Sequence, residues 1–385
     1  MRAYLDHATA APPDARVHAA MAPFLGDAFG SPASLHGWAE RPALAVEEAR
    51  AHVAALVGAE VDEVIFTAGA TESRNLAIKG LVGANRALGG GIVTTAVEHP
   101  ATLAACRTLE RAGHRLAVVG VDGEGRVDPD ALAAAVDDET ALVTIHHGQG
   151  EIGTVQDVAA LVAAVRARRP EARVHLDAGE TAGLLALDVA ALDVDALTIG
   201  GWPVGAPPWT GALVVREGAR LHPLIEGGVQ ERGKRAGAEC VPAIAGLGEA
   251  ARLAAGEMEW RAERMRSLGE RLADGLLALP DVRLNGPRRG RIPGHVQVST
   301  GTVEGESLAL ALAARGVACA PGSACTAHGG KAAPTLEAVG MEAPWTHTAV
   351  LFTAGPHTRA GEVDYALEVV EEELARLRAI SPLAG

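Results

Sequence analysis

Short apolar runs alternate with Ala- and Leu-rich stretches of helical spacing along the first two thirds of the chain. The apolar runs predict strands over residues 64–67, 91–95, 115–119, 141–145, 174–177, 196–199 and 211–215. The stretches between them predict helices over residues 43–57, 101–112, 128–136 and 155–168. This alternation is typical of a mainly parallel sheet covered by helices on both faces, so we expect an α/β fold.

The pattern changes after about residue 250, where the elements no longer alternate regularly. We expect a long Arg- and Glu-rich helix, a strand, a second helix, a Gly/Ala loop and a final amphipathic helix, over about 256–279, 296–299, 307–315, 320–331 and 360–380. These elements predict a smaller α+β domain. The predicted division is a large α/β domain over 14–250 and a small domain formed by 1–13 and 251–385.

Composition limits the classes of function. Of 385 residues, 48% are hydrophobic and 21% are charged, enough for a large packed core. The formal net charge is −14 with the acidic residues scattered, which argues against nucleic acid or an acidic membrane as the main partner. No run of eighteen apolar residues occurs, and the first six residues lack the apolar core of a signal peptide. We expect a cytoplasmic protein.

Cysteine and lysine usage narrows the chemistry. Four unevenly spaced cysteines without a CxxC pair argue against a disulfide framework and against a structural zinc site. Of the 34 basic residues only Lys79, Lys234 and Lys331 are lysines. An enzyme that needs a Schiff-base lysine therefore has three candidates.

Polar residues at the carboxyl ends of predicted strands are candidate ligand contacts, because open α/β sheets bind ligands at that edge. Ala70 and Thr71 lie in a small-residue turn where backbone N–H groups can face an anion, although a simple helix cap fits as well. His99 opens a helix, where a structural hydrogen bond is the alternative. Asp177 can fix the ring nitrogen of a ligand or cap a helix.

These segments, in this order, resemble the cysteine desulfurases of the class V aminotransferase superfamily, which are PLP-dependent enzymes of fold type I. The resemblance implies a large domain with a mainly parallel seven-stranded sheet, a smaller α+β domain, and a homodimer with the cofactor near the subunit interface. It also places at Cys325 the loop cysteine that receives sulfur as a persulfide. The motifs that carry the resemblance run almost end to end, over residues 4–9, 29–36, 66–73, 98–100, 151–157, 176–178, 231–233 and 322–325.

The cofactor site departs from the family pattern at the lysine that anchors PLP and at its phosphate donors. The family has Ser-x-His-Lys where this chain has Gly200, Gly201, Trp202 and Pro203. Proline has no amine, and the serine and histidine donors are gone. The threonine that reaches the phosphate across the dimer falls at Ala238.

Two more family residues are replaced. The glutamine that meets the PLP phenolic oxygen aligns with Glu180, and the arginine that grips the substrate carboxylate aligns with Leu351. What still matches is Ala70 with Thr71, His99, Asp177 and Cys325.

The loss of three phosphate donors has a large effect on the expected affinity for PLP. A charge-assisted hydrogen bond to phosphate contributes about 1.5–3 kcal/mol, and each 1.4 kcal/mol is about tenfold in affinity. Three lost donors weaken PLP binding by several orders of magnitude. We therefore expect no resident cofactor and no covalently bound PLP. Lys79 and Lys234 fit surface roles better, and Lys331, on the loop of Cys325, lacks the fixed geometry that a Schiff base needs.

The sequence therefore predicts a cysteine desulfurase-like protein that has lost PLP-dependent catalysis. We expect a sulfur-transfer accessory, partner subunit or scaffold, as a homodimer or with an intact paralogue, passing sulfur from Cys325 to an acceptor protein. One alternative is a repurposed pocket with noncovalent PLP, with Cys325 as nucleophile and His99 beside it, or with a metal held by His99, His147, Asp177 and Glu180. The other is a working desulfurase whose lysine lies elsewhere.

Overall fold

A seven-stranded sheet forms the centre of the larger part of the molecule. The computed structural model describes residues 1–322 and 333–380. Every strand of the sheet runs in the same direction except β8, which is antiparallel to both of its neighbours. The expected mainly parallel seven-stranded sheet is confirmed. In spatial order its strands are β2 (Val64–Thr67), β8 (Gly211–Val215), β7 (Ala196–Gly200), β6 (Arg173–Ala178), β5 (Thr140–His146), β3 (Gly91–Thr95) and β4 (Leu116–Val119).

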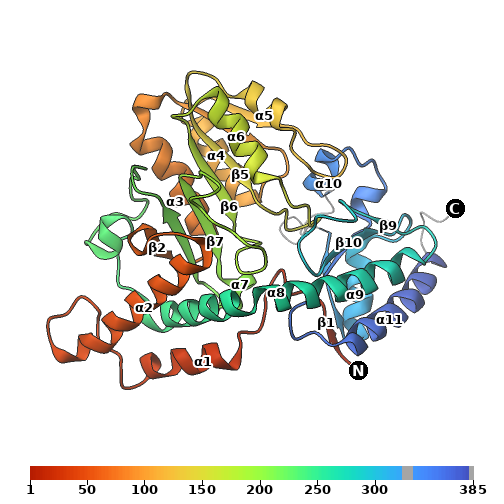
Figure 1. Cartoon of the computed structure of the whole chain (residues 1–385). Coiled ribbons are helices and arrows are strands. Elements are labelled where there is room, and N and C mark those ends of the chain that lie inside the picture. Colours follow the sequence, from red (N-terminus) through yellow and green to blue (C-terminus); the bar gives the residue numbers. More distant parts are fainter. Residues whose placement is uncertain (323–332, 381–385) are drawn as a thin grey trace.

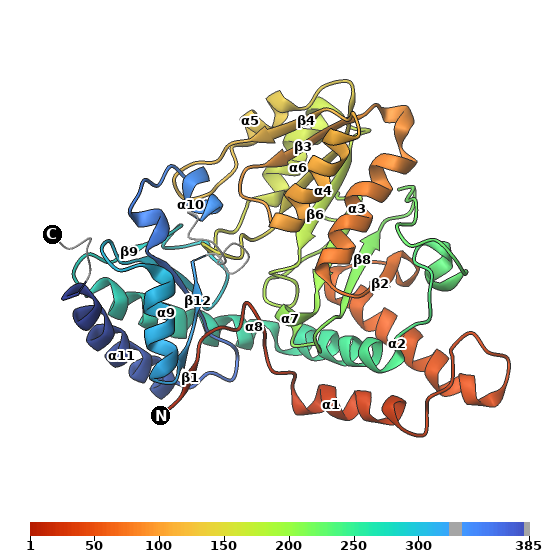
Figure 2. The same cartoon turned by 180° about the vertical axis from the view of Figure 1, so that it is seen from behind.

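Helices cover both faces of this sheet, because successive strand residues point to opposite sides and both sides are apolar. In β2, Ile65 packs among residues of α3 (Ala70–Ala84) and α4 (Pro100–Arg111), the layer in front in Figure 2. Val64 and Phe66 belong to the opposite core cluster. That cluster includes residues of α2 (Glu40–Val57), α5 (Pro129–Ala135) and α6 (Val158–Arg168), and α5 and α6 lie in front in Figure 1.

A smaller antiparallel sheet packs beside the large one. Its order is β12 (Ala320–Pro321), β13 (Ala349–Thr353), β10 (His295–Ser299) and β9 (Arg283–Leu284). The chain's first strand, β1 (Ala3–Tyr4), pairs in parallel with β11 (Val317–Ala318), so residues from both ends of the chain build this region. Its core includes residues of α9 (Gly305–Ala314) and α11 (Ala360–Arg378).

The long helix α8 (Val241–Leu277) joins the two parts (Figure 1). The prediction that it begins near residue 256 is wrong. The missed stretch is rich in Ala and Gly, which lets α8 lie close against α2: a Cβ on Gly248 would come 2.4 Å from the Ala49 side chain. Residues up to Ala254 pack in the core of the large sheet, and residues from Leu268 pack in the small one. The predicted boundary at 250/251 falls within this helix, and the division itself stays a prediction.

The remaining elements are short. They are the helices α1 (Ala15–Met21), α7 (Gly201–Val204) and α10 (Pro334–Ala338), and 3-10 helices at Ala22–Leu25, Gly37–Ala39, Val61–Glu63, Arg86–Leu88, Gln230–Gly233 and Trp345–His347. Within residues 1–322 and 333–380, none of the helices combines the length and the apolar character that crossing a membrane requires.

Candidate functional site

A cavity of about 600 Å³ lies at the carboxyl ends of the central strands. Its wall is formed by the N-termini of α3 and α4, the loops after β5, β6 and β7, the segment Ala8–Ala11, and Leu351 on β13. This is the edge at which open α/β sheets bind ligands. Both sheets thus contribute to one site.

Most of the predicted site residues meet at this cavity. It is lined by Ala70, Thr71, His99, Asp177, Glu180, Gly200, Trp202 and Leu351. Pro203 is buried in α7 without lining the cavity, and Ala238 is exposed on the loop that precedes α8. Cys325 lies outside the described residues. Eight of the positions that the resemblance assigns to the cofactor site thus meet at one cavity.

The most consequential residue of the cavity is Arg74, which the sequence analysis did not single out. Its Nε donates to Asp177 Oδ2 at 2.6 Å and its Nη2 donates to Glu180 Oε1 at 3.2 Å. The side chains of Arg74 and Asp177 are each 2% exposed. The sequence did hold a signal: Arg74 lies four residues after Ala70, on the same face of α3, and helical side chains lean toward the N-terminus.

Burial and charge set the ionisation of this triad. Burial raises the pKa of Asp177, but the charge and hydrogen bond of Arg74 outweigh it and hold that pKa below its usual value. For Glu180 burial prevails, so its pKa is raised although Arg74 and a hydrogen bond from Trp202 lower it. Asp177 is thus the firm anionic partner of Arg74.

His99 is a neutral hydrogen-bond donor in the cavity wall. It caps α4, and its Nδ1 accepts from the backbone N–H of Ala101 at 3.0 Å, which leaves the proton on Nε2. Burial and the nearby Arg74 charge lower its pKa from 6.5 to about 4. His99 can therefore donate from Nε2 at neutral pH, and it is a weak base.

A second buried pair, His146 with Glu98, fixes the wall on the side of β5. His146 Nδ1 lies 2.8 Å from Glu98 Oε1, and the Gln156 side-chain amide lies 2.9 Å from His146 Nε2. Since Glu98 accepts on one side and Gln156 donates on the other, both ring nitrogens are engaged. His146 lines the cavity as a fixed structural group. Spacing along the chain does not predict this pair, because its members are 48 residues apart.

The alternative metal set does not assemble. His147 Nδ1 lies 2.9 Å from Thr181 Oγ1, and both carboxylates of the set are bound to Arg74. Within the part of the chain that the structure describes, no three or more His, Cys, Asp or Glu side chains are placed to hold a metal ion.

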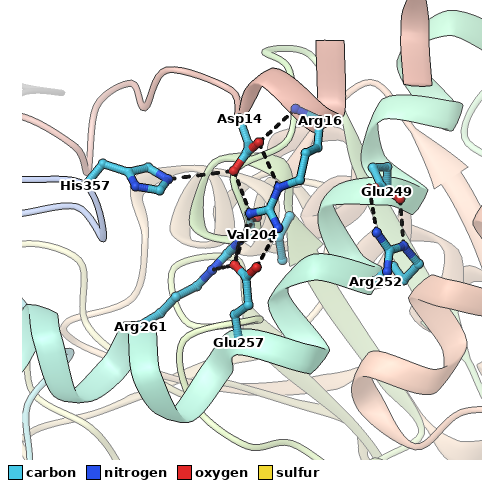
Figure 3. Close-up of polar contacts among 8 residues, drawn as sticks. All are labelled: Asp14, Arg16, Val204, Glu249, Arg252, Glu257, Arg261 and His357. Carbon is cyan, nitrogen blue, oxygen red and sulfur yellow. Dashed lines mark hydrogen bonds and ion pairs between the residues drawn. The ribbon is translucent and has the colours of Figure 1, made fainter. Parts of the chain in front are cut away.

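A side chain of α8 holds the short helix α7, which carries Trp202 and Pro203, in place. The buried Arg261 of α8 donates to the Val204 carbonyl at 3.2 Å and pairs with Glu257 at 2.8 Å (Figure 3). Glu257 also pairs with Arg16 of α1 at 2.7 Å. The Trp202 ring lies 6.3 Å from that of His295. The cavity wall is thereby tied to α8 and α1.

The described lysines lie elsewhere. Neither Lys79 nor Lys234 lines the cavity, and Lys234 lies near Arg232, Glu63 and Asp62. Lys331 is outside the described residues. Neither described lysine can therefore supply a Schiff-base amine at this site.

PLP, which the resemblance implies, does not fit these residues. The carboxylate of Asp177, to which the family's ring nitrogen binds, is already paired with an arginine. Glu180 places a second carboxylate at the position of a neutral glutamine. The indole of Trp202 and the side chain of Leu351 occupy wall positions that held polar donors. The site thus lacks three of the phosphate donors that the resemblance implies, and the carboxylate that would bind the ring nitrogen is already paired with Arg74.

Comparison with known proteins places the chain. Residues 3–364 match the family described as Aminotransferase class-V. The cysteine desulfurase IscS of Dictyoglomus turgidum is 40% identical over 380 residues, covering 98% of this chain and 96% of its own. That of Methanosarcina thermophila is 38% identical, covering 99% and 94%.

Solved structures agree with this placement. A NifS-like protein superposes with a TM-score of 0.92 at 31% identity, covering 98% of this chain and 100% of its own. DndA of Streptomyces lividans gives a TM-score of 0.76 at 30% identity, covering 89% and 97%. The expected fold type I architecture is confirmed. The chain belongs to the class V aminotransferase family and, within it, to the cysteine desulfurase family.

Proposed function

We propose that this member of the cysteine desulfurase family has lost PLP-dependent catalysis and serves in sulfur transfer as an accessory or partner subunit. The observation that carries the proposal is the ion pair between Arg74 and Asp177, because it engages the carboxylate that a cofactor ring needs. Pro203 at the position of the anchoring lysine supports it independently.

The remaining chemistry rests on Cys325. In the proposed step, its thiolate attacks the outer sulfur of a persulfide on a donor protein. A new S–S bond forms at Cys325, the donor's S–S bond breaks, and the donor cysteine leaves as a thiolate. Atoms and electrons balance without a cofactor or an external oxidant. A subunit of this kind needs an intact donor, which favours pairing with an active paralogue or another persulfide-forming enzyme.

The test is to mix the purified full-length protein with excess PLP, with and without cysteine, and to follow absorption before and after borohydride. We expect no borohydride-stable pyridoxyl adduct by intact mass and no sulfide release. A stoichiometric adduct on any lysine of this chain would overturn the proposal.

The sulfur-transfer half is tested separately. The protein is incubated with a persulfide-loaded desulfurase and its cysteines are analysed by alkylation and mass spectrometry. We expect persulfide on Cys325 and its loss in Cys325→Ser, while Cys240→Ser, which removes an exposed cysteine, keeps it. Absence of persulfide on Cys325 would reject the carrier role.

The size of the cavity favours a second candidate function, an enzyme that reuses it. A space of about 600 Å³ with the neutral Nε2–H donor of His99 can hold a small molecule. Native mass spectrometry of the purified protein tests this candidate. A stoichiometric bound small molecule other than PLP would favour it over the carrier.

A further inference from the structure

We propose that Arg74 is an internal cation that takes the place of the cofactor's ring nitrogen beside Asp177, with Gly179 and Gly200 as the positions that make room for it. This inference rests on the proposed function and adds the two glycines whose missing side chains leave room for Arg74. It predicts that restoring a lysine at position 203 alone does not restore cofactor binding.

The guanidinium of Arg74 lies between two carboxylates. Arg74 reaches the cavity from the second turn of α3 and donates to Asp177 and Glu180 through two different nitrogens. The Asp177 carboxylate has its other oxygen, Oδ1, 3.0 Å from the N–H of Gly179. A protonated ring nitrogen of a ligand would therefore have to displace Arg74 to reach Asp177.

The position of Arg74 requires space that only glycine leaves at positions 179 and 200. A Cβ on Gly179 would lie 2.4 Å from Arg74 Nη2 and 2.9 Å from Asp177 Oδ1, closer than real Cβ contacts allow, so a side chain there would disturb both members of the ion pair. A Cβ on Gly200 would in turn lie 2.3 Å from the Gly179 carbonyl oxygen. The family's serine at position 200 does not fit this backbone. Arg74, Gly179 and Gly200 are thus coupled: the arginine needs the first glycine, and the carbonyl of that glycine needs the second.

The charge of Arg74 also opposes its displacement from Asp177. Displacing Arg74 would leave a buried guanidinium without its carboxylate, and losing one such charge-assisted bond costs a factor of about 10 to 100 in affinity. The exclusion of the cofactor is therefore separable from the missing amine. It depends on the pairing of Arg74 and on the room left by its two glycines.

The experiment compares Pro203→Lys, Arg74→Asn and the double variant with the wild-type full chain. Each is incubated with PLP, reduced with borohydride and analysed by intact mass and absorption. We expect little adduct in Pro203→Lys, none in Arg74→Asn, and at least about tenfold more in the double variant than in Pro203→Lys. Equal trapping in both lysine variants, or no trapping in a folded double variant, overturns the inference.

The control removes a different buried arginine. Arg50 pairs with Glu231 at 2.8 Å and does not line the cavity. Pro203→Lys with Arg50→Gln should trap no more adduct than Pro203→Lys alone. An equal gain there would show a general loosening of the fold and would overturn the assignment to Arg74.

A second variant keeps the inference testable if Arg74→Asn does not fold. Gly179→Ala keeps every charge, but its Cβ would lie 2.4 Å from Arg74 Nη2 and 2.9 Å from Asp177 Oδ1 and would push the two groups apart. Pro203→Lys with Gly179→Ala should therefore also trap more adduct than Pro203→Lys. No gain in that variant counts against the inference. Wild-type protein that itself forms an adduct would instead reject the proposed function, so the two failures are distinguishable.

Discussion

Two buried arginines, Arg74 and Arg50, are held by buried carboxylates. Arg74 pairs with Asp177 in the cavity wall, and Arg50 pairs with Glu231 of the 3-10 helix at Gln230–Gly233. A buried pair of this kind adds little net stability compared with apolar residues, but removing one partner leaves an uncompensated charge. Arg74 is therefore structurally required once Asp177 is ionised.

Arg74→Met should lower the free energy of unfolding by about 3–5 kcal/mol, because Asp177 is left as a buried, unpaired carboxylate. Asp177→Asn in the same chain should recover part of that loss. Urea unfolding of the two single variants and the double variant measures the coupling. Strict additivity of the two effects would contradict the pairing.

His175 makes the stability depend on pH. It is buried between Thr144 and Thr198, whose hydroxyl oxygens lie 2.8 and 2.9 Å from its two ring nitrogens. Burial lowers its pKa from 6.5 to about 4. The unfolded chain therefore binds a proton near pH 6.5 that the folded chain refuses until about pH 4, so stability falls as the pH falls through this window.

Glutamine does not titrate, so His175→Gln should remove the contribution of this one proton to the pH dependence of the unfolding free energy. The slope of the unfolding free energy between pH 4.5 and 6 should decrease by roughly 1.4 kcal/mol per pH unit. Unfolding in urea at several pH values measures it. An unchanged slope would mean that His175 is not the neutral buried group described above.

At the scale of elements, α7 depends on contacts far from the cavity. Its last residue, Val204, accepts a hydrogen bond from Arg261 on α8, and Glu257 links Arg261 to Arg16 (Figure 3). The turn that holds Trp202 is thus fixed by a helix that also belongs to the core of the small sheet.

Arg261→Met should lower the unfolding free energy by about 1–3 kcal/mol, since the Val204 carbonyl loses a buried donor. Trp202 fluorescence should shift as α7 loosens. Arg252→Met on the same helix is the control, because Arg252 is 51% exposed and pairs with Glu249 one turn away, so the loss of this pair costs little (Figure 3). Equal effects of the two substitutions would contradict a special role for Arg261.

The turn from β7 into α7 tolerates no side chain at position 200. Gly200→Ala should destabilise the chain by about 1–3 kcal/mol, because the added Cβ meets the Gly179 carbonyl. Gly256→Ala in α8, where a Cβ meets nothing within 4 Å, should stabilise by up to about 1 kcal/mol. Thermal unfolding of both variants compares them. An unchanged melting temperature in Gly200→Ala would contradict the close contact between residue 200 and the Gly179 carbonyl oxygen.

At the scale of the whole molecule, the segment before α2 exposes an apolar surface. Phe29, Leu35 and Trp38 are 70%, 105% and 63% exposed, and the Phe29 and Trp38 rings contact each other. Exposed apolar patches of this kind mark interaction surfaces. This segment of the chain lies well away from the small sheet (Figure 1).

We expect the protein to sediment as a dimer, as the family resemblance implies, and Leu35→Ser with Trp38→Ser to yield monomer. Analytical ultracentrifugation measures both. Leu310→Ser, at an exposed leucine of α9, is the matched control and should leave the mass unchanged. A monomeric wild type would contradict this expectation for the isolated chain and favour a different partner.

Strands were easier to anticipate than helix ends. The apolar run at 174–177 predicted β6 closely, because a strand buried on both faces must be apolar throughout. The start of α8 was missed because Ala and Gly there give no clear periodicity, and only contact with α2 explains them. Cavity residues such as His99 and Asp177 could be predicted because they follow or end strands whose carboxyl ends form the ligand-binding edge of the sheet.

The order of strands and helices, the family, and the proline at the position to which the resemblance assigns the anchoring lysine can be read from residue type and spacing along the chain. The contact of Arg74 with Asp177 and Glu180, more than one hundred residues away, follows from the folded chain alone. Such an ion pair depends on which side chains the packed sheet and helices bring together, and spacing along a chain does not determine that.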